Sequence, residues 1–417
     1  MEKQDYFVFN PWWEERSFET GFRRGAYLDL FEKRLGRKQI ELITGSRRVG
    51  KTTILKQVIG DLLRKGVSPE QILYVSCDFA RAIGVSVSDH LTAFRQVFSH
   101  PRSKKLYLFF DEVQDSPNWQ AELKTLYDGE NLKMFCSGST SALVSSHGGK
   151  LTGREINTVI YPLSFGEFLE FRQKKIRPSE SYLLEKEVRD YLTVGGYPEN
   201  VLAPSNEYLS ALVEDIFARD LGRIYPIRNP EVVRDLYKLL MAGVGSRTSF
   251  NRLAGILGIS VDTVKDYVSY FEASFLTGKL EQWSTSHSKR VYGPKKIYPL
   301  DTGLKTLMTG EGDLGAKAET AVYWKLKKQS QKLGFVFEDG KELDFVAQGP
   351  EGNVAVEVKF SSDREKLLRE GEVVAGFWGK NGGGEKLLVV TENFSHKTGF
   401  SGGKVEFVPL GEFLVED

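Results

Sequence analysis

The chain has 417 residues and a formal net charge of +1, with hydrophobic residues at 41% and charged residues at 27%. At roughly 150 residues per domain, this length predicts two to four domains. The composition is that of an ordinary globular protein. Because the charge is nearly balanced, no global field attracts nucleic acid or membranes, so a nucleic-acid surface has to be a local patch.

Other features of the sequence bear on its compartment. No apolar run approaches the ~20 residues that a membrane helix needs, and residues 1–5 do not form a signal peptide. Cys77 and Cys136 lie in expected strands without metal-ligand spacing, so we expect buried thiols in a reducing compartment. The sequence therefore predicts a cytoplasmic protein with no membrane partner.

The N-terminal segment is rich in aromatic residues. Trp12 and Trp13 follow Pro11, and we expect such side chains to pack against a domain or a neighbouring subunit. The apolar spacing from Tyr27 to Leu35 then predicts an amphipathic helix that leads into the first strand.

The next stretch, residues 45–52, fits the pattern G-x-x-x-x-G-K-[ST] of a phosphate-binding loop, the P-loop. The apolar run from Ile40 to Thr44 predicts a buried strand before it, and residues 53–59 predict a helix after it. This strand–loop–helix context is the one that the motif requires. The alternative is a degenerate loop that no longer binds nucleotide.

The residue types of this loop predict ATP binding with Mg²⁺. Glycines let the backbone N–H groups face the phosphates, and the helix N-terminus adds its positive dipole end. Lys51 can reach the β- and γ-phosphates in a catalytic role, and the Thr52 hydroxyl can hold Mg²⁺. The expected nucleotide-binding residues are Gly45, Ser46, Arg47, Arg48, Val49, Gly50, Lys51, Thr52 and Thr53.

A second acidic motif follows the continuous apolar run from Leu106 to Phe110. Asp111 and Glu112 come directly after this expected strand, which is the Walker-B pattern. We expect Asp111 to bind Mg²⁺ and Glu112 to polarise the attacking water. The alternative is an ordinary acidic turn at the end of a strand.

Two further residues are candidates for the same site. Ser139 follows the next expected strand, where a polar side chain can contact the γ-phosphate or its water, with Ser137 as the runner-up. Arg154 can stabilise transition-state charge at its own site or at a neighbour's. The alternatives are turn chemistry for the serines and a surface or structural role for the arginine.

The alternation of apolar strands with helices over residues 40–160 predicts a parallel sheet covered by helices on both faces. From Phe165 to Leu221 the periodicity is helical, interrupted at residues 195–198. Residues 250–271 predict a helix–turn–helix in which Gly258 permits the turn and Ser260 caps the second helix.

Backbone contacts to DNA are one expectation for this middle unit. The run from Lys289 to Lys296 is a candidate basic wing, whereas the acids Asp262, Asp266 and Glu272 on the second helix argue against base reading, because carboxylates repel phosphates. The alternative is a folded module for contacts between domains or subunits.

The C-terminal part carries a set of acidic residues and a lysine. Glu357 and Lys359 are two positions apart, so on a strand both point to one face of a sheet. Together with Asp344 on the preceding strand and Glu319 on a helix, they resemble the PD-(D/E)xK nuclease core. Asp344 and Glu357 could hold Mg²⁺, Lys359 could orient the water, and Glu319 could complete the metal shell.

One observation weighs against cleavage by this set. The residue before Asp344 is Leu343 and not the proline of the motif's name. The alternative is a fold in which the acids and the lysine form an ion-pair network without catalysis.

The motifs together resemble a known family, the AAA+-type P-loop ATPases of archaea and bacteria with a poorly characterised C-terminal domain. The segments that carry the resemblance are residues 111–114 with Trp119, 137–139, 151–154, 161–168, 195–198 and 296–304. The resemblance implies an ATPase core, a helical lid, a winged-helix-like unit and a PD-(D/E)xK nuclease-like domain, and members that assemble as homo-oligomers.

The expected fold is α/β: a P-loop NTPase parallel sheet with helices on both faces, then a helical and winged-helix unit, then a small α/β nuclease-like domain. The expected boundaries are 1–160, 161–228, 229–305 and 306–417. One hypothesis is a nucleic-acid-associated ATPase whose C-terminal domain binds or cuts DNA. The other is a nucleotide-dependent regulatory or scaffolding ATPase whose C-terminal units bind protein partners. A nucleoside or small-molecule kinase is disfavoured, since no acceptor-binding signature is visible.

Overall fold

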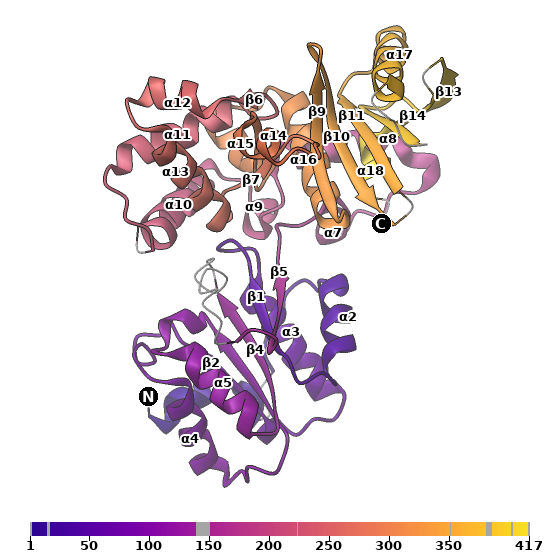
Figure 1. Cartoon of the computed structure of the whole chain (residues 1–417). Coiled ribbons are helices and arrows are strands. Elements are labelled where there is room, and N and C mark those ends of the chain that lie inside the picture. The colour runs from indigo at the N-terminus through magenta and orange to yellow at the C-terminus, as the bar shows by residue number, and fades with distance from the viewer. Residues whose placement is uncertain are drawn as a thin grey trace. The chain divides into compact units, whose positions relative to one another are not determined.

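The structure, a computed structural model, describes residues 2–14, 17–138, 151–222, 224–350, 352–380, 386–401 and 403–415. The chain forms two compact units, Met1–Tyr161 and Pro162–Asp417. Both combine helices with sheets, so the fold class is α/β, as predicted (Figure 1). The further division into four domains stays a prediction.

The N-terminal unit contains a five-stranded sheet in the order β2-β3-β4-β1-β5, with all neighbouring strands parallel. Its strands are β1 (Ile40–Thr44), β2 (Ile72–Ser76), β3 (Leu106–Asp111), β4 (Leu132–Gly138) and β5 (Glu155–Val159). Its helices are α1 (Lys3–Phe9), η1 (Pro11–Glu14), α2 (Gly25–Arg34), α3 (Lys51–Arg64), η2 (Pro69–Gln71), α4 (Val87–Phe98), η3 (Val113–Asp115) and α5 (Trp119–Gly129).

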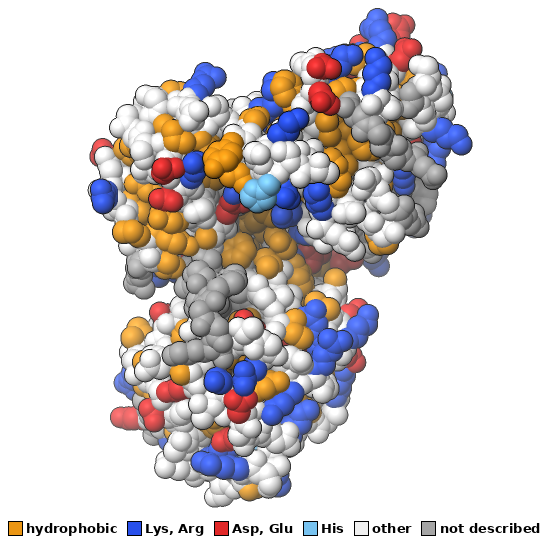
Figure 2. Space-filling view, in the orientation of Figure 1, with side chains coloured by type: hydrophobic (Ala, Val, Ile, Leu, Met, Phe, Trp, Pro, Cys, Tyr) orange, Lys and Arg blue, Asp and Glu red, His pale blue; other side chains and the backbone are white. Residues whose placement is uncertain are grey.

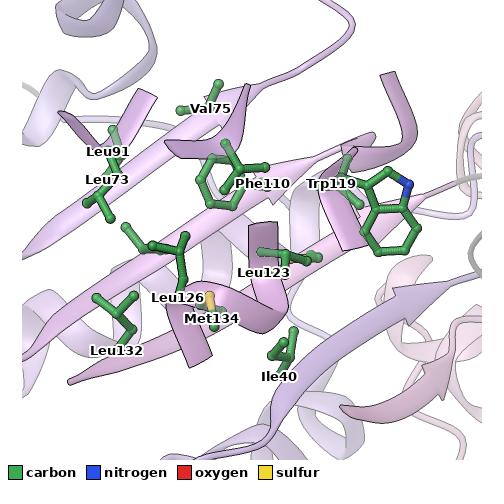
Figure 3. Packing of buried hydrophobic residues seen from close by; sticks show 14 of the residues in the cluster. Ile40, Leu73, Val75, Leu91, Phe110, Trp119, Leu123, Leu126, Leu132 and Met134 are labelled. Atoms are coloured by element: carbon green, nitrogen blue, oxygen red, sulfur yellow. The ribbon is translucent and has the colours of Figure 1, made fainter. Parts of the chain in front are cut away.

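Alternating side chains of these strands pack against different helices. Leu108 and Phe110 of β3 belong to a core cluster shared with α4 and α5 (Figure 3). Phe109 stacks on Phe135 with ring centroids 4.9 Å apart, and Phe31 of α2 meets Phe135 edge-on. The two faces of the sheet are therefore both covered, which explains why the strands are continuously apolar.

The N-terminal aromatics pack on this same unit. The ring centroids of Trp13 and Phe98 are 4.8 Å apart. The side chain of Asn10 forms two hydrogen bonds with the backbone of Tyr74, at 2.7 and 2.9 Å. Of the two expectations for this segment, packing against a domain is the one the structure has. Both cysteines are buried free thiols, as expected.

The second unit begins with helices and continues into two sheets. Its helices as far as residue 330 are α7 (Phe165–Phe171), η4 (Pro178–Glu180), α8 (Ser181–Val194), α9 (Pro198–Leu202), α10 (Asn206–Asp215), the π-helix η5 (Ile216–Leu221), α11 (Pro230–Ala242), α12 (Phe250–Leu257), α13 (Val261–Ala273), α14 (His287–Tyr292), α15 (Thr302–Thr309) and α16 (Leu314–Gln329). A three-stranded sheet has the order β6-β8-β7, formed by β6 (Arg247–Thr248), β7 (Thr277–Leu280) and β8 (Lys295–Pro299).

The helix–turn–helix has the local geometry that the sequence predicts. Gly258 takes the left-handed conformation with a φ of 65°, and the Ser260 hydroxyl accepts a hydrogen bond from the backbone N–H of Thr263 at 3.1 Å. The basic wing is not formed as predicted. The segment from His287 to Tyr292 is the helix α14, and Lys295 and Lys296 are buried in β8, so these two ammonium groups are not displayed to solvent.

The C-terminal part is a six-stranded sheet in the order β13-β14-β12-β11-β10-β9. Its elements are β9 (Lys332–Glu338), β10 (Lys341–Gly349), β11 (Gly352–Lys359), α17 (Arg364–Lys380), β12 (Lys386–Thr391), β13 (His396–Phe400), β14 (Gly403–Pro409) and α18 (Leu410–Val415). Helix α17 shares a buried apolar cluster with this sheet. The segment after β7 also pairs with β9, because Trp283 and Phe335 are joined by a backbone hydrogen bond of 2.6 Å. The two sheets of this unit therefore lie against each other.

None of the helices in the described ranges is both long enough and apolar enough to cross a lipid bilayer.

Candidate functional site

The P-loop follows β1 at the carboxyl edge of the parallel sheet. Gly45 has a φ of 150°, and a Cβ atom there would lie 2.3 Å from the carbonyl oxygen of Ile160. Gly50 has a φ of 97° and directly precedes α3. Both positions need glycine, one for close backbone approach and one for its left-handed conformation. The sequence predicted this strand–loop–helix arrangement, and the structure has it.

The two expected magnesium ligands meet at this edge. The hydroxyl Oγ1 of Thr52, in the first turn of α3, donates to Oδ2 of Asp111, at the end of β3, over 2.5 Å. Burial raises the pKa of the Asp111 carboxyl, and the hydroxyl donors Ser137 and Thr52 partly offset that rise. A hydroxyl and a carboxylate at one point are oxygen ligands of the kind that Mg²⁺ prefers.

Lys51 of the loop and Glu112 lie close to each other. The Lys51 ammonium donates to the carbonyl oxygens of Gly45 at 3.1 Å and Ser46 at 2.9 Å, and lies 3.9 Å from Oε1 of Glu112. Glu112 has a φ of 50°, which a non-glycine residue rarely adopts. Its carboxylate accepts a hydrogen bond of 2.6 Å from the side-chain amide of Gln114. The geometry thus holds a carboxylate beside the loop's lysine.

The other two candidates of this group have different outcomes. Ser139 lies outside the described residues. Arg154 precedes β5, and Ile40, at the start of β1, donates its backbone N–H to the carbonyl of Arg154 at 2.8 Å. Because the P-loop follows the other end of β1, Arg154 lies at the opposite edge of the sheet, and its Nε donates to Asp128 at 2.9 Å. A role for Arg154 at its own P-loop does not fit this position.

Three side chains at the site were missed or placed second by the sequence argument. The Tyr74 hydroxyl donates to Asp111 at 2.9 Å, and Ser137, the runner-up to Ser139, is hydrogen-bonded to the same carboxylate. Ser137 also accepts from the backbone N–H of Glu112 at 3.1 Å. Gln114 lies in the segment 111–114 that carries the family resemblance, but no role of its own was predicted for it. The signal for Tyr74 was a hydroxyl-bearing residue among the apolar residues Ile72, Leu73 and Val75 of β2.

A match to known families agrees with this geometry. Residues 37–169 match a family model described as an AAA domain. This matched segment contains the P-loop, Thr52, Asp111 and Glu112. A second model, a domain of unknown function named DUF8612, matches residues 185–315.

Curated relatives are similar over much of the chain. An uncharacterized protein of Methanocaldococcus jannaschii, MJ1544, is 26% identical over 350 residues, which is 80% of this chain and 77% of the relative. An uncharacterized protein of Haemophilus influenzae is 26% identical over 332 residues, 77% of this chain and 82% of the relative. Both relatives are described as uncharacterized.

Solved structures resemble the chain only weakly. Thermotoga maritima RuvB is 15% identical with a TM-score of 0.28, covering 67% of this chain and 89% of that one. AMPPCP-bound DnaA from Aquifex aeolicus is 20% identical with a TM-score of 0.28, covering 60% and 89%. At these TM-scores the two likenesses carry no argument, and the AAA domain rests on the family match and the site.

The nuclease-like set of the second unit is also brought together. The backbone N–H of Asp344 donates to Oε2 of Glu357 at 3.1 Å, and Lys359 lies 2.8 Å from Oε1 of Glu357. Glu319 joins the set through Lys296, a residue that the sequence argument assigned to the wing. Burial raises the pKa of the Glu357 and Glu319 carboxyls, and the nearby charge of Asp344 raises it further.

Proposed function

We propose that the AAA domain binds ATP and hydrolyses it with Mg²⁺ at the carboxyl edge of β1 and β3. The observation that carries this proposal is the 2.5 Å contact between the Thr52 hydroxyl and the Asp111 carboxylate. These two side chains would hold the ion. When bound, Mg²⁺ neutralises the charge that develops on the transferring phosphoryl group.

The other residues of the site have separate roles in this proposal. Residues 45–50 present backbone N–H groups to the phosphates. Lys51 exchanges its contacts with the Gly45 and Ser46 carbonyls for phosphate oxygens. Glu112 orients the attacking water and withdraws its proton, since a carboxylate beside the loop is placed to act as a general base.

The test is ATP hydrolysis by the full chain with and without Mg²⁺. We expect Mg²⁺-dependent turnover that Glu112→Gln abolishes while nucleotide binding persists, since only the base is lost. Glu70→Gln, an exposed glutamate in η2, is the matched control and should keep the wild-type rate. Turnover of Glu112→Gln at the wild-type rate would contradict the proposed base.

For the rest of the chain, we propose the regulatory or scaffolding role with a protein partner over the DNA-associated role. Phosphate binding depends on exposed basic residues, and burial of Lys295 and Lys296 removes two of the bases expected on the wing. On the face that Figure 2 shows, Lys and Arg side chains are interspersed with Asp and Glu. This pattern supports protein contacts over binding to a polyanion.

Binding of fluorescent duplex DNA at low and moderate salt tests this choice. The regulatory role predicts no salt-sensitive binding beyond that of a neutral protein. Binding that weakens steeply with salt and is reduced by Lys289→Ala would favour DNA instead. The expected homo-oligomer, the cytoplasmic location and a role for Arg154 in a neighbour's site stay predictions.

A further inference from the structure

Lys296 extends from β8 into the acidic residues of the C-terminal sheet. Its Nζ atom lies 2.8 Å from Asp344, 2.8 Å from Glu342 and 3.0 Å from Glu319. An ammonium group has three N–H donors, so these carboxylates account for all of them. The side chain is 1% exposed, which places this cation out of reach of solvent.

Two of these carboxylates, Glu319 and Glu342, also contact residues of β6 and β8 and of the segment that precedes β6. Glu319 accepts a hydrogen bond of 2.6 Å from the Tyr298 hydroxyl, and Gly245 lies so close that a Cβ there would be 2.6 Å from Glu319 Oε2. Glu342 forms an ion pair of 2.9 Å with Arg247. Elements β6 and β8 therefore cover the acidic residues.

The remaining members of the nuclease-like set are satisfied within the C-terminal sheet. Oδ2 of Asp344 accepts from the backbone N–H of Val358 at 3.0 Å. Glu357 receives Lys359 on one oxygen and the backbone N–H of Asp344 on the other. Each carboxylate that a metal ion would need already has partners on the protein.

The charges of these side chains also argue against a bound metal ion. Four carboxylates, Glu319, Glu342, Asp344 and Glu357, are paired with three cations, Lys296, Arg247 and Lys359. Lys359 also lies 3.8 Å from Glu370 at the edge of this set. A divalent ion among these oxygens would lie within a few ångströms of a buried ammonium, where repulsion between like charges is strong. The residues present fit a metal ion only if the Lys296 ammonium moves out of the site. Its departure would leave buried carboxylates without their cation, which is energetically costly.

We propose that the Lys296 ammonium is the resident cation of this acidic site. Glu319, Asp344 and Glu357 then bind no divalent metal, the C-terminal sheet does not cleave phosphodiester bonds, and the acids serve to fix β8 against that sheet. Burial alone would lower the pKa of Lys296, but Asp344, Glu319 and Glu342 raise it above its usual value, so the cation persists. This inference is independent of ATP hydrolysis by the AAA domain.

Terbium luminescence of the full chain without nucleotide tests it. Tb³⁺ occupies oxygen-rich cation sites and emits when a nearby tyrosine or tryptophan is excited, and Tyr298 touches Glu319. Because the Tyr74 hydroxyl is hydrogen-bonded to Asp111, Tb³⁺ bound at the proposed Mg²⁺ site of the AAA domain would also emit. The informative quantity is therefore the part of the emission that Asp344→Asn removes.

We expect the emission that depends on Asp344 to be absent in the wild type and to appear in Lys296→Met. The apparent affinity of this site for Tb³⁺ should be at least about tenfold tighter in Lys296→Met than in the wild type. Adding Asp344→Asn to Lys296→Met should abolish it. Lys305→Met is the matched control, because Lys305 is also 1% exposed but its ammonium binds the Met241 carbonyl and Asp313 outside this set. Lys305→Met should gain no emission.

Three results would overturn the proposal. The first is wild-type emission that Asp344→Asn removes, a comparison that holds even if Lys296→Met fails to fold. The second is a folded Lys296→Met, judged by circular dichroism, that gains no Tb³⁺ site. The third is Mn²⁺-dependent DNA cleavage by the wild type that Glu357→Ala abolishes.

Discussion

The carboxylate of Asp301 accepts a hydrogen bond of 2.6 Å from the backbone N–H of Gly196, although the two residues are 105 positions apart. Its other oxygen accepts from the backbone N–H of Gly303 at 2.9 Å. Asp301 is 5% exposed. This one side chain therefore joins the end of α8 to the start of α15, and it connects two of the segments that carry the family resemblance.

Asp301 should make the stability of the second unit depend on pH. Burial raises its pKa to about 6 from the usual 3.8, although backbone donors including Gly196 and Gly303 oppose the rise. Between these values the folded state binds more protons than the unfolded state, so the stability from this group falls as pH rises from about 4 to 6. This shift of the Asp301 pKa corresponds to a change of about 3 kcal/mol in the free energy of unfolding.

Asp301→Asn tests this dependence. The amide keeps one acceptor but presents an N–H₂ group to a backbone donor, so the variant should be less stable than the wild type at pH 4. The gap in free energy of unfolding should then narrow by pH 7, because only the wild type loses stability over this range. Urea denaturation at each pH measures this difference in free energy of unfolding. The transition to follow is the one that ATP does not shift, because it reports on the second unit. A gap that is constant with pH would contradict the raised pKa.

Gly196→Ala should destabilise the same junction. A Cβ at Gly196 would lie 2.3 Å from the carbonyl oxygen of Leu163, whose N–H is itself bonded to the Gly196 carbonyl at 2.7 Å. Because backbone on both sides has to move, we expect a loss of about 3 kcal/mol. Thermal and urea unfolding measure it.

The matched control for that change is Gly376→Ala. Gly376 lies inside α17, and a Cβ there would meet no atom within 4 Å. Alanine in a helix interior should stabilise by about 0.5–1 kcal/mol. Equal effects of the two substitutions would show that the close approach at Gly196 is not what fixes the junction.

The parts of the molecule that the sequence predicts well are those whose chemistry is local. The P-loop is encoded in consecutive residues 45–52, and its glycines are required by backbone geometry at those same positions. Asp111 follows from an apolar strand that ends in an acid. The parallel sheet follows from strands apolar on both faces, as the packing of Phe109 and Phe110 on opposite sides shows.

Side chains whose environment comes from residues distant in the sequence were not predicted correctly. Lys296 was placed on a basic wing because bases adjoin it, yet its partners Glu319 and Asp344 lie 23 and 48 positions away. Arg154 follows the strand that ends at Ser137, so the sequence predicted a role for it at its own P-loop or at a neighbour's, and only the first of these does not fit its position. Its actual edge depends on the direction of β5, which runs parallel to β1 and starts beside Ile40.

Thr52→Val should impair catalysis more than nucleotide binding. Valine has the shape of threonine without the hydroxyl that meets Asp111 at 2.5 Å, so one proposed Mg²⁺ ligand is lost. We expect kcat for ATP hydrolysis to fall about 100-fold in Thr52→Val. The variant Thr52→Ser, which keeps the hydroxyl, should retain most of the wild-type kcat. Thr125→Val, on α5 with its hydroxyl bonded to the Ala121 carbonyl, is the control. A wild-type rate in Thr52→Val would remove Thr52 from the ion's ligands.

Gln114→Ala should lower kcat without weakening ATP binding. The Gln114 amide donates to Glu112 at 2.6 Å, and Glu112 itself lies beside the P-loop lysine. Without this donor the proposed base loses one fixed orientation, and the carboxylate also loses a hydrogen bond that favours its charged form. We expect kcat to fall about tenfold, with the acidic limb of the pH–rate profile moved to higher pH. Nucleotide affinity, measured by calorimetry, should not change, because Gln114 contacts the base and not the phosphate loop. A purely structural role would instead lower affinity and rate together and leave the pH profile in place, and that result would exclude Gln114 as the residue that positions Glu112.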